Sequence, residues 1–288
     1  MGLPAHGQSR VTRTRSPGFA IIRNLVFGDL PPMPALSLAL HFIRREIRNR
    51  YLGSFSGGLW ALLQPLIQLA VYGFVFVYVF KAKVPGADAP GYVPFLVMGL
   101  WPWNAFAEGV GRATTAIQDN AALIGKVALP REVLVFSAVA ASFLLQGLGF
   151  CAIAIALRLF GVPVDLLALP LAFLGFVQLF ILALGFAFLF AAVQVFVRDL
   201  APALPQLLML WMFASPVFYA RDSLPERYQG WMNFNPFTRY AEFFRATLLH
   251  SGTTSLSAQA ISLAVALAIL ALGYGVFRRL GPHFEDFL

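Results

Sequence analysis

Long apolar runs separated by short polar segments constrain the fold of this chain more than any other feature. A helix that crosses a bilayer needs about 20 mostly apolar residues, and its backbone polar groups must be hydrogen-bonded within the protein. Six runs approach this length, at residues 58–80, 92–114, 133–157, 167–195, 202–220 and 257–277. The second contains Glu108, and the fifth begins in the proline-rich turn "RDLAPALP". We therefore predict an all-α, polytopic membrane protein with six transmembrane helices.

The composition favours a membrane over nucleic acid as the partner of the positive charge. Only 12% of the residues are charged, whereas a soluble domain carries about a quarter. The formal net charge is +8, but the Lys and Arg residues flank the apolar runs, where a membrane surface accounts for them. The single cysteine, Cys151, lies inside an apolar run. We expect it to be a small buried hydrophobe, with no disulfide or cysteine-based metal cluster.

The distribution of Lys and Arg predicts that both termini lie on the cytoplasmic side. With this orientation most of the 21 basic residues fall on the inner side, as the positive-inside rule requires. The outer segments then hold Lys81, Lys83, Arg158, Arg221, Arg227, Arg239 and Arg245. We also predict a basic N-terminal tail over residues 1–33, followed by one transmembrane domain over residues 34–288.

A basic amphipathic helix is predicted immediately before the first apolar run. One of its faces is apolar, with Leu36, Leu40, Ile43, Ile47 and Tyr51. The opposite face is polar, with Arg44, Arg45, Arg48 and Asn49. Such a helix suits the inner leaflet, with its basic side chains toward lipid phosphates or a cytoplasmic subunit. An ordinary positively charged flank of a membrane span is the alternative.

Polar side chains also occur inside the first two apolar runs. Gln64, Gln68 and Tyr72 lie one turn apart on one face of the first run. Helix packing or a hydrated path between subunits would satisfy them equally well. In the second run, Glu108 and Arg112 have the i, i+4 spacing of an ion pair on one helix face.

The sequence contains no recognisable nucleotide-binding or catalytic motif. "ALIGKVAL" contains Gly-Lys, but Asn120 stands where a phosphate-binding loop needs Gly, and Val127 stands where it needs Ser or Thr. We find no HExxH motif and no Ser/His/Asp set that spacing singles out. If the chain moves a substrate, the energy should therefore come from another polypeptide.

The inner segment "IQDNAALIGKVALPRE", residues 117–132, is a plausible docking site for that polypeptide. Asp119 or Asn120 is positioned to cap a short helix that Pro130 would end. Its apolar residues are Leu123, Ile124, Val127 and Leu129. Insertion of these side chains into the membrane interface is the alternative.

Residues 221–255 are too polar to span a membrane but rich in aromatic side chains. Ser223 and Glu226 have capping-box spacing, and Asn235 followed by Pro236 marks a second helix start, with an end near Gly252. We predict two short helices that dip into the membrane beside protein. An interfacial aromatic belt is the alternative.

The order of these parts resembles the ABC-2-type transporter permease family, most closely the branch that exports O-antigen, capsule, teichoic acid and related lipid-linked glycans. The resemblance extends from about residue 35 to nearly the end of the chain. Its most specific stretch is "RREIRNRYLGSFSGGLWALLQPLIQLAVYGFVFVYVFK". It continues in "GLWPWNAFAEGV", "LIGKVALPRE", "VRDL" and "SPVFYARDSLPERYQGWMNFNPFTRYAEFFR".

The resemblance implies a homodimer of permease chains with two ATP-binding-cassette subunits. ATP and Mg would bind to these partners, and this chain would carry no cofactor or metal and no catalytic residue. It maps ATPase coupling onto Asp119, Leu123, Ile124, Lys126 and Arg131. It maps the interface helix onto Arg44, Arg45, Arg48, Arg50 and Tyr51. It maps an outer gate of short re-entrant helices onto Trp231, Asn235, Pro236 and Tyr240.

A glycan path would make use of the aromatic content, because sugar C–H faces pack on rings and sugar hydroxyls bond to Gln and Tyr. Our candidates are Gln64, Gln68, Tyr72, Phe76, Trp101, Trp103, Trp211 and Tyr219. The alternative is that these aromatic side chains face lipid or the protein core. Two other functions stay open: an ABC-2 permease for a drug or another small hydrophobic molecule, and a membrane-embedded transferase, for which "FEDF" near the C-terminus is little support.

Overall fold

The computed structural model describes residues 35–51, 57–81, 91–124, 130–250 and 255–288. The chain divides into two units, Met1–Leu38 and Ala39–Leu288. The first unit contributes only the first turn of helix α2 to the described residues, and the predicted basic tail lies outside them. The arrangement described below is that of the second unit.

All regular elements among these residues are helical, as predicted, and no strand occurs in them. The first half contains α2 (Ala35–Tyr51), α3 (Gly57–Phe74) with its π-helical extension η1 (Val75–Val79), α4 (Tyr92–Thr115), η2 (Gln118–Asn120), α5 (Ala121–Ile124) and α6 (Arg131–Leu159). The second half contains α7 (Leu169–Phe196), α8 (Leu200–Phe213), α9 (Glu226–Gln229), η5 (Trp231–Phe234), α10 (Pro236–Leu249), α11 (Leu256–Leu280) and α12 (Phe284–Phe287).

Within the described ranges, three helical segments are long and apolar enough to cross a membrane: Arg131–Leu159, Leu166–Phe196 and Leu256–Phe287. Two shorter apolar helices cover Leu66–Val79 and Leu200–Phe213. The fifth predicted run, 202–220, is wrong in its second half, because the helix ends at Phe213. Pro216 disfavours helical backbone at Ser215 and has no N–H group to donate, so the chain turns there.

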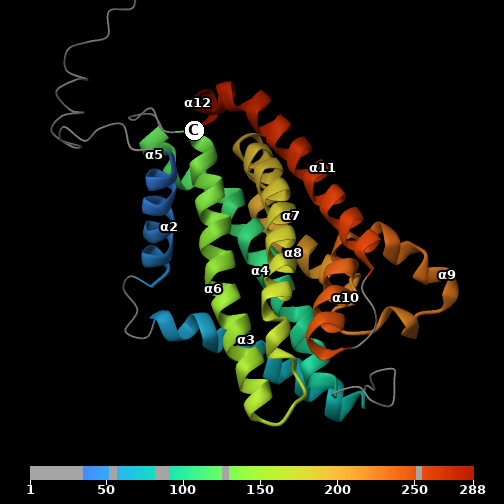
Figure 1. Ribbon diagram of the computed structural model, residues 1–288. Coiled ribbons are helices and arrows are strands. Elements are labelled where there is room, and N and C mark those ends of the chain that lie inside the picture. Colours follow the sequence, from blue (N-terminus) through green and yellow to red (C-terminus); the bar gives the residue numbers. More distant parts are fainter. Residues whose placement is uncertain (1–34, 52–56, 82–90, 125–129, 251–254) are drawn as a thin grey trace, which may run out of the picture. The chain divides into compact units, whose positions relative to one another are not determined.

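Helices α4, α6 and α7 pack against one another at the centre of this unit, and α11 packs along α7 (Figure 1). Two glycines allow the α7–α11 contact to be close. A Cβ atom on Gly185 of α7 would lie 2.7 Å from the backbone of Ile269 in α11, and a Cβ atom on Gly273 would collide with the backbone of Gly185. Backbones this close leave no room for a side chain at either position.

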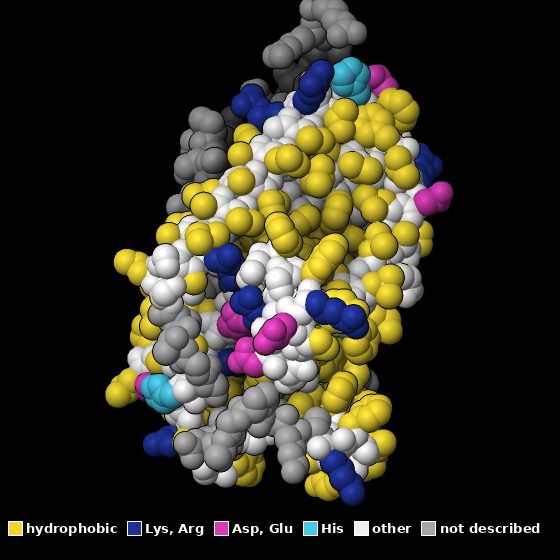
Figure 2. All heavy atoms as spheres, turned by 90° about the vertical axis from the view of Figure 1, so that its right-hand side faces the viewer, with side chains coloured by type: hydrophobic (Ala, Val, Ile, Leu, Met, Phe, Trp, Pro, Cys, Tyr) yellow, Lys and Arg dark blue, Asp and Glu magenta, His cyan; other side chains and the backbone are white. Residues whose placement is uncertain are grey.

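Much of the exposed surface of α11 is apolar, as a lipid-facing surface must be. Figure 2 shows hydrophobic side chains over much of the face that α11 forms, and Ile261, Val265 and Leu272 of α11 are exposed there. Cys151, which we expected to be buried, is also exposed on α6. That prediction was wrong because an apolar run specifies hydrophobic surroundings but not whether protein or lipid supplies them.

Candidate functional site

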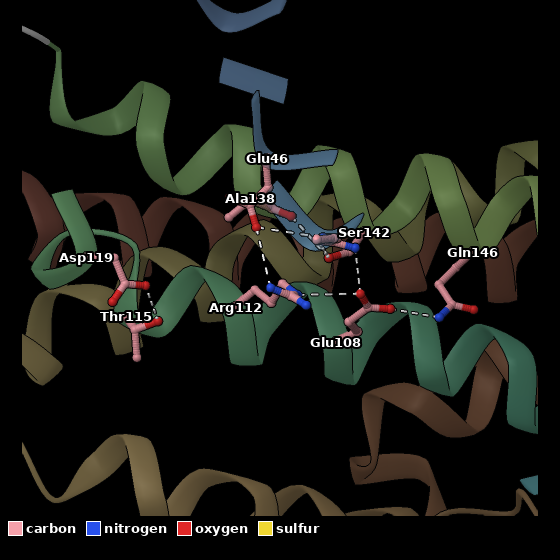
Figure 3. Close-up of polar contacts among 9 residues, drawn as sticks. Glu46, Glu108, Arg112, Thr115, Asp119, Ala138, Ser142 and Gln146 are labelled. Atoms are coloured by element: carbon pink, nitrogen blue, oxygen red, sulfur yellow. Dashed lines mark hydrogen bonds and ion pairs between the residues drawn. The ribbon is translucent and has the colours of Figure 1, made fainter. Parts of the chain in front are cut away.

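Three helices meet at a cluster of charged and polar side chains that we call the polar centre: Glu46 and Arg50 of α2, Glu108 of α4, and Ser142 and Gln146 of α6. Arg50 Nη1 pairs with Glu108 Oε1 at 2.6 Å, and Arg50 Nη2 donates to Ser142 Oγ at 2.6 Å. Gln146 Nε2 donates to the other Glu108 oxygen at 2.7 Å. In Figure 3 the labelled members turn toward one another between the helices. The Arg50 side chain is only 4% exposed, so its charge depends on these partners.

The predicted pair of Glu108 and Arg112 is confirmed, but it is a minor contact. Their closest atoms lie 3.7 Å apart, and Arg112 also lies 3.7 Å from Glu46. Arg112 is 47% exposed, so solvent screens both contacts. Sequence reasoning missed Glu46, Ser142 and Gln146. Ser142 and Gln146 have i, i+4 spacing on an apolar helix, which was the available signal.

Helix α2 packs on the protein through a face that overlaps only in part with the predicted one: Ile43 is buried and Ile47 packs beside it, as expected. Ala39, Phe42 and Ile43 are buried, whereas Leu40, which we placed on the apolar face, is exposed. Arg44 and Arg48 are exposed, in agreement with the predicted basic face.

The remaining residues assigned to the interface helix are placed differently. The Arg45 guanidinium lies over the Phe42 ring and donates to the Asn120 side chain. Arg45 and Arg50 therefore point into this chain, not toward lipid phosphates. The side chain of Tyr51 lies outside the described residues.

The predicted coupling segment begins as η2 and α5. Contrary to our prediction, neither Asp119 nor Asn120 caps the helix that follows it. Instead, the Thr115 hydroxyl donates to the Asp119 carboxylate at 2.8 Å, and the Asn120 amide donates to the Ala116 carbonyl at 2.8 Å. Both side chains thus bond back to the end of α4. Leu123 is half-buried. Ile124 is buried.

The second half of the coupling segment is only partly described. Lys126, Val127 and Leu129 lie outside the described residues. Arg131, at the start of α6, donates to the Gly281 carbonyl and pairs with Glu285 of α12. The C-terminal helix of the same chain therefore holds the residue that we had assigned to ATPase coupling.

The described part of the polar stripe on α3 faces other parts of the same chain. Gln68 accepts a hydrogen bond from the Asn104 amide of α4 at 3.0 Å. Tyr72 packs edge-on against Phe218, and Phe76 stacks on the same ring, at centroid distances of 5.1 and 5.2 Å. The side chain of Gln64 lies outside the described residues. Helix packing therefore provides a donor for the Gln68 oxygen, while its half-exposed side chain still reaches the surface of the chain.

The candidate tryptophans fall into two groups. Trp101 and Trp103, which we had predicted to line the glycan path, are 3% and 2% exposed. Both side chains therefore lie in the core of this chain. Trp101 Nε1 donates to the Gln146 carbonyl at 2.9 Å. Trp211 of α8 is half-buried. It lies edge-on to Trp103 at 5.7 Å. Tyr219 is also half-buried, and its hydroxyl donates to the Phe213 carbonyl at 3.3 Å.

The helix start at Asn235-Pro236 is confirmed. Asn235 Oδ1 accepts from the Phe237 N–H at 3.0 Å, which caps α10, and the same oxygen accepts from Trp211 Nε1 at 3.0 Å. The Asn235 amide also donates to Ser215 Oγ at 2.8 Å, so this cap ties α10 to the end of α8.

The rest of the predicted outer gate is divided between core and surface. Tyr240 is 2% exposed and Trp231 is 74% exposed. The predicted capping box was wrong, because Pro225 stands at the N-cap of α9 and no side chain caps that helix. Helix α10 ends at Leu249, slightly before the predicted end, and His250 follows in the left-handed conformation.

Sequence reasoning gave no signal for Arg245 of α10, which is 3% exposed. Its guanidinium donates to the carbonyls of Pro216 and Val217 at 2.7 Å and of Phe95 at 3.2 Å, and it stacks on the Phe95 ring at 3.5 Å. Burial lowers the pKa of Arg245 to about 9. The side chain holds α10 to α4 and to the turn after α8.

Charged side chains gather beside α10 on the face in Figure 2. In α10, burial raises the pKa of the Glu242 carboxyl, and the nearby Arg221 partly offsets this. No group of three His, Cys, Asp or Glu side chains within the described ranges could hold a metal ion.

Comparison with known proteins identifies the family of this chain. Residues 38–249 match the family described as "ABC-2 type transporter". The chain is 28% identical over 251 residues to the O-antigen export system permease protein RfbA of Klebsiella pneumoniae, covering 85% of this chain and 92% of that protein. It is 32% identical over 203 residues to the protein of the same name from Myxococcus xanthus, covering 66% and 70%.

A third relative differs in its named substrate. The chain is 29% identical over 210 residues to the polysialic acid transport protein KpsM of Escherichia coli, covering 71% of this chain and 78% of that protein. The match over residues 38–249 and the long apolar helices agree with the family resemblance of the sequence. The chain is a multi-pass membrane protein and belongs to the ABC-2 type transporter family.

Proposed function

We propose that this chain is the permease subunit of an ATP-binding-cassette exporter that moves a lipid-linked polysaccharide, of the O-antigen, capsule or teichoic acid type, across the bacterial inner membrane. The similarity to proteins named for O-antigen export and polysialic acid transport carries this proposal, because it extends over most of both chains. The relatives named above include no drug exporter, so the glycan assignment is favoured over the small-molecule one.

In this proposal the chain is a transport subunit, and ATP with Mg binds and reacts on two partner ATPase subunits. The coupling segment, within residues 117–132, would contact the ATPase. Two contacts support this placement: Asn120 bonds to Arg45 of the predicted interface helix, and Arg131 bonds to the C-terminal helix. Figure 1 shows α5 and α12 at one end of the helix bundle, with α2 below α5 alongside α6. That end of the bundle would thus present these elements to a cytoplasmic partner, with both termini inside.

The proposed transmembrane domain has six spans. Helices α6, α7 and α11 supply three of them, and α3 with η1, α4 and α8 would supply the others. Arg245 in α10 bonds near the start of α4, whereas the coupling segment follows its end. This separation supports outer positions for α10 and for the gate residues Trp231, Asn235, Pro236 and Tyr240.

The glycan path would lie between two copies of the chain. Its lining would come from side chains at least partly exposed in the single chain, among them Gln68, Tyr72, Phe76, Trp211 and Tyr219. Their rings offer faces for sugar C–H groups, and their amides and hydroxyls offer weak hydrogen bonds. Repeated weak contacts would allow a long polymer to slide.

The decisive experiment is deletion of the gene in its own host. We expect lipid-linked glycan to accumulate on the cytoplasmic face while surface glycan disappears, with recovery on complementation. An ATPase-site variant of the partner should give the same phenotype, because the two subunits act in one machine. Unchanged surface glycan together with increased sensitivity to a drug would refute glycan export and favour the small-molecule alternative.

A further inference from the structure

A buried glutamine near the end of α7 links the coupling segment to α8. Gln194 is 2% exposed. Its amide nitrogen donates to Gln118 Oε1 at 3.0 Å and to the Arg198 carbonyl at 3.2 Å. Its amide oxygen accepts from the Ala201 N–H at 2.7 Å. Both amide hydrogens and the oxygen of Gln194 are therefore engaged.

The link to Gln118 is reciprocal, because the Gln118 amide donates back to the Gln194 backbone carbonyl at 3.0 Å. Gln118 is the first residue of η2, directly before α5 in the coupling segment. Two hydrogen bonds thus fix the start of this segment to the end of α7. Two bonds between one pair of residues restrain orientation as well as distance, which a single bond does not.

The bond to Ala201 fixes a second element to the same side chain. Ala201 lies in the first turn of α8, where backbone N–H groups have no partner inside the helix. The N-cap residue Asp199 makes no side-chain capping bond. Gln194 supplies a cap from the preceding helix, so the start of α8 and the start of η2 share one anchor.

A merely structural role accounts for only part of this arrangement. Capping α8 uses the amide oxygen alone, and the bond to Arg198 closes the turn between α7 and α8. The reciprocal pair with Gln118 contributes to neither task. Its effect is to join a segment proposed to contact the ATPase with a helix proposed to line the glycan path.

We propose that Gln194 is a positioning residue that makes η2 and the start of α8 move as one body, so that displacement of the coupling segment reaches the glycan path. This inference rests on the proposed function. It assigns the transmission to one side-chain pair, Gln118 and Gln194, and predicts that loss of the pair separates ATP hydrolysis from export.

The test measures glycan exported per ATP hydrolysed by the full complex of permease and ATPase. Inside-out vesicles from the source strain supply the probe, which is the strain's own lipid-linked glycan labelled with a radioactive sugar nucleotide. The Gln118→Leu variant removes both bonds of the link but keeps the cap of α8. Gln194→Leu removes the cap and one of the two link bonds, because the Gln118 amide can still donate to the backbone carbonyl of residue 194. Gln178→Leu is the matched control, since Gln178 lies on the same helix and its buried Oε1 has no hydrogen-bond partner.

We expect Gln118→Leu and Gln194→Leu to lower the export-to-hydrolysis ratio about fivefold or more. Fivefold is about the lower end of the effects by which one site changes another in coupled proteins. The double variant should have the same ratio as Gln118→Leu, because that single change already breaks both bonds of the link. The ratio for Gln178→Leu should match the wild type. If Gln194→Leu fails to assemble, Gln118→Leu decides the question.

A wild-type ratio in Gln118→Leu would overturn the inference, and so would equal losses of hydrolysis and export in that variant. Failure of the proposed function looks different, because the wild-type complex itself would then move no labelled glycan.

Discussion

The polar centre makes a quantitative prediction, because Arg50 within it and Arg112 beside it differ sharply in their surroundings. Replacement of Arg50 by Met removes a 2.6 Å ion pair with Glu108 and a 2.6 Å bond to Ser142. Breaking a buried ion pair costs about 3–5 kcal/mol. Glu108 is 30% exposed and keeps Gln146 as a donor, so we place the loss of unfolding free energy at the low end, about 3 kcal/mol.

Arg112→Met is the matched control for this prediction. Arg112 contacts the same Glu108 on the same helix, but at 3.7 Å and with 47% of its side chain exposed. Exposed pairs contribute less than about 1 kcal/mol. Reversible unfolding in mixed detergent micelles, followed by fluorescence, measures both variants. A double-mutant cycle of Arg50→Met with Glu108→Gln should show non-additive losses.

Either of two results would refute this reasoning. One is an equal loss of stability in Arg50→Met and Arg112→Met, which would mean that burial does not govern the strength of the pair. The other is strict additivity in the double-mutant cycle, which would mean that the side chains of Arg50 and Glu108 do not interact.

Three further predictions concern other contacts. Gly273→Ala should destabilise the protein by about 1–3 kcal/mol through overpacking against α7, whereas Gly275→Ala, which meets nothing within 4 Å, should be nearly neutral in thermal unfolding. Arg245→Met leaves three carbonyls without their donor and should cost about 3 kcal/mol; unchanged thermal stability would contradict the role that we assign to this residue. Leu123→Asp should release the ATPase subunit in co-purification while the permease still inserts. Ala122→Asp, at an exposed neighbouring position, should leave the ATPase bound. Retention of the ATPase by both variants would place the contact elsewhere.

Features that depend on neighbouring residues could be predicted from the sequence. The all-helical fold and the long apolar segments follow from the length and composition of the runs, because a membrane span is specified by consecutive residues. The start of α10 follows from Asn235 and Pro236, since a cap and a proline act on the next turn. The family could also be identified, because its motifs are linear stretches in a fixed order.

Local patterns failed where a distant contact or an adjacent proline took precedence. Ser223 and Glu226 have the spacing of a capping box, yet Pro225 between them occupies the N-cap position. Leu40 has the same periodicity as the buried Ile43 but is exposed, whereas Ala39 and Phe42, outside the predicted face, are buried. Periodicity gives a hydrophobic stripe; the packing of the other helices decides which edge of it is covered.

Only the tertiary structure could decide the pairings at the sites. Arg50 and Glu108 are 58 positions apart, Gln118 and Gln194 are 76 apart, and Arg245 and Phe95 are 150 apart. Residue type states that an arginine or a buried glutamine needs partners, because unsatisfied polar groups are costly away from water. Which partners it finds depends on how the helices cross, and helix crossing is set by the packing of whole surfaces, not by any one segment.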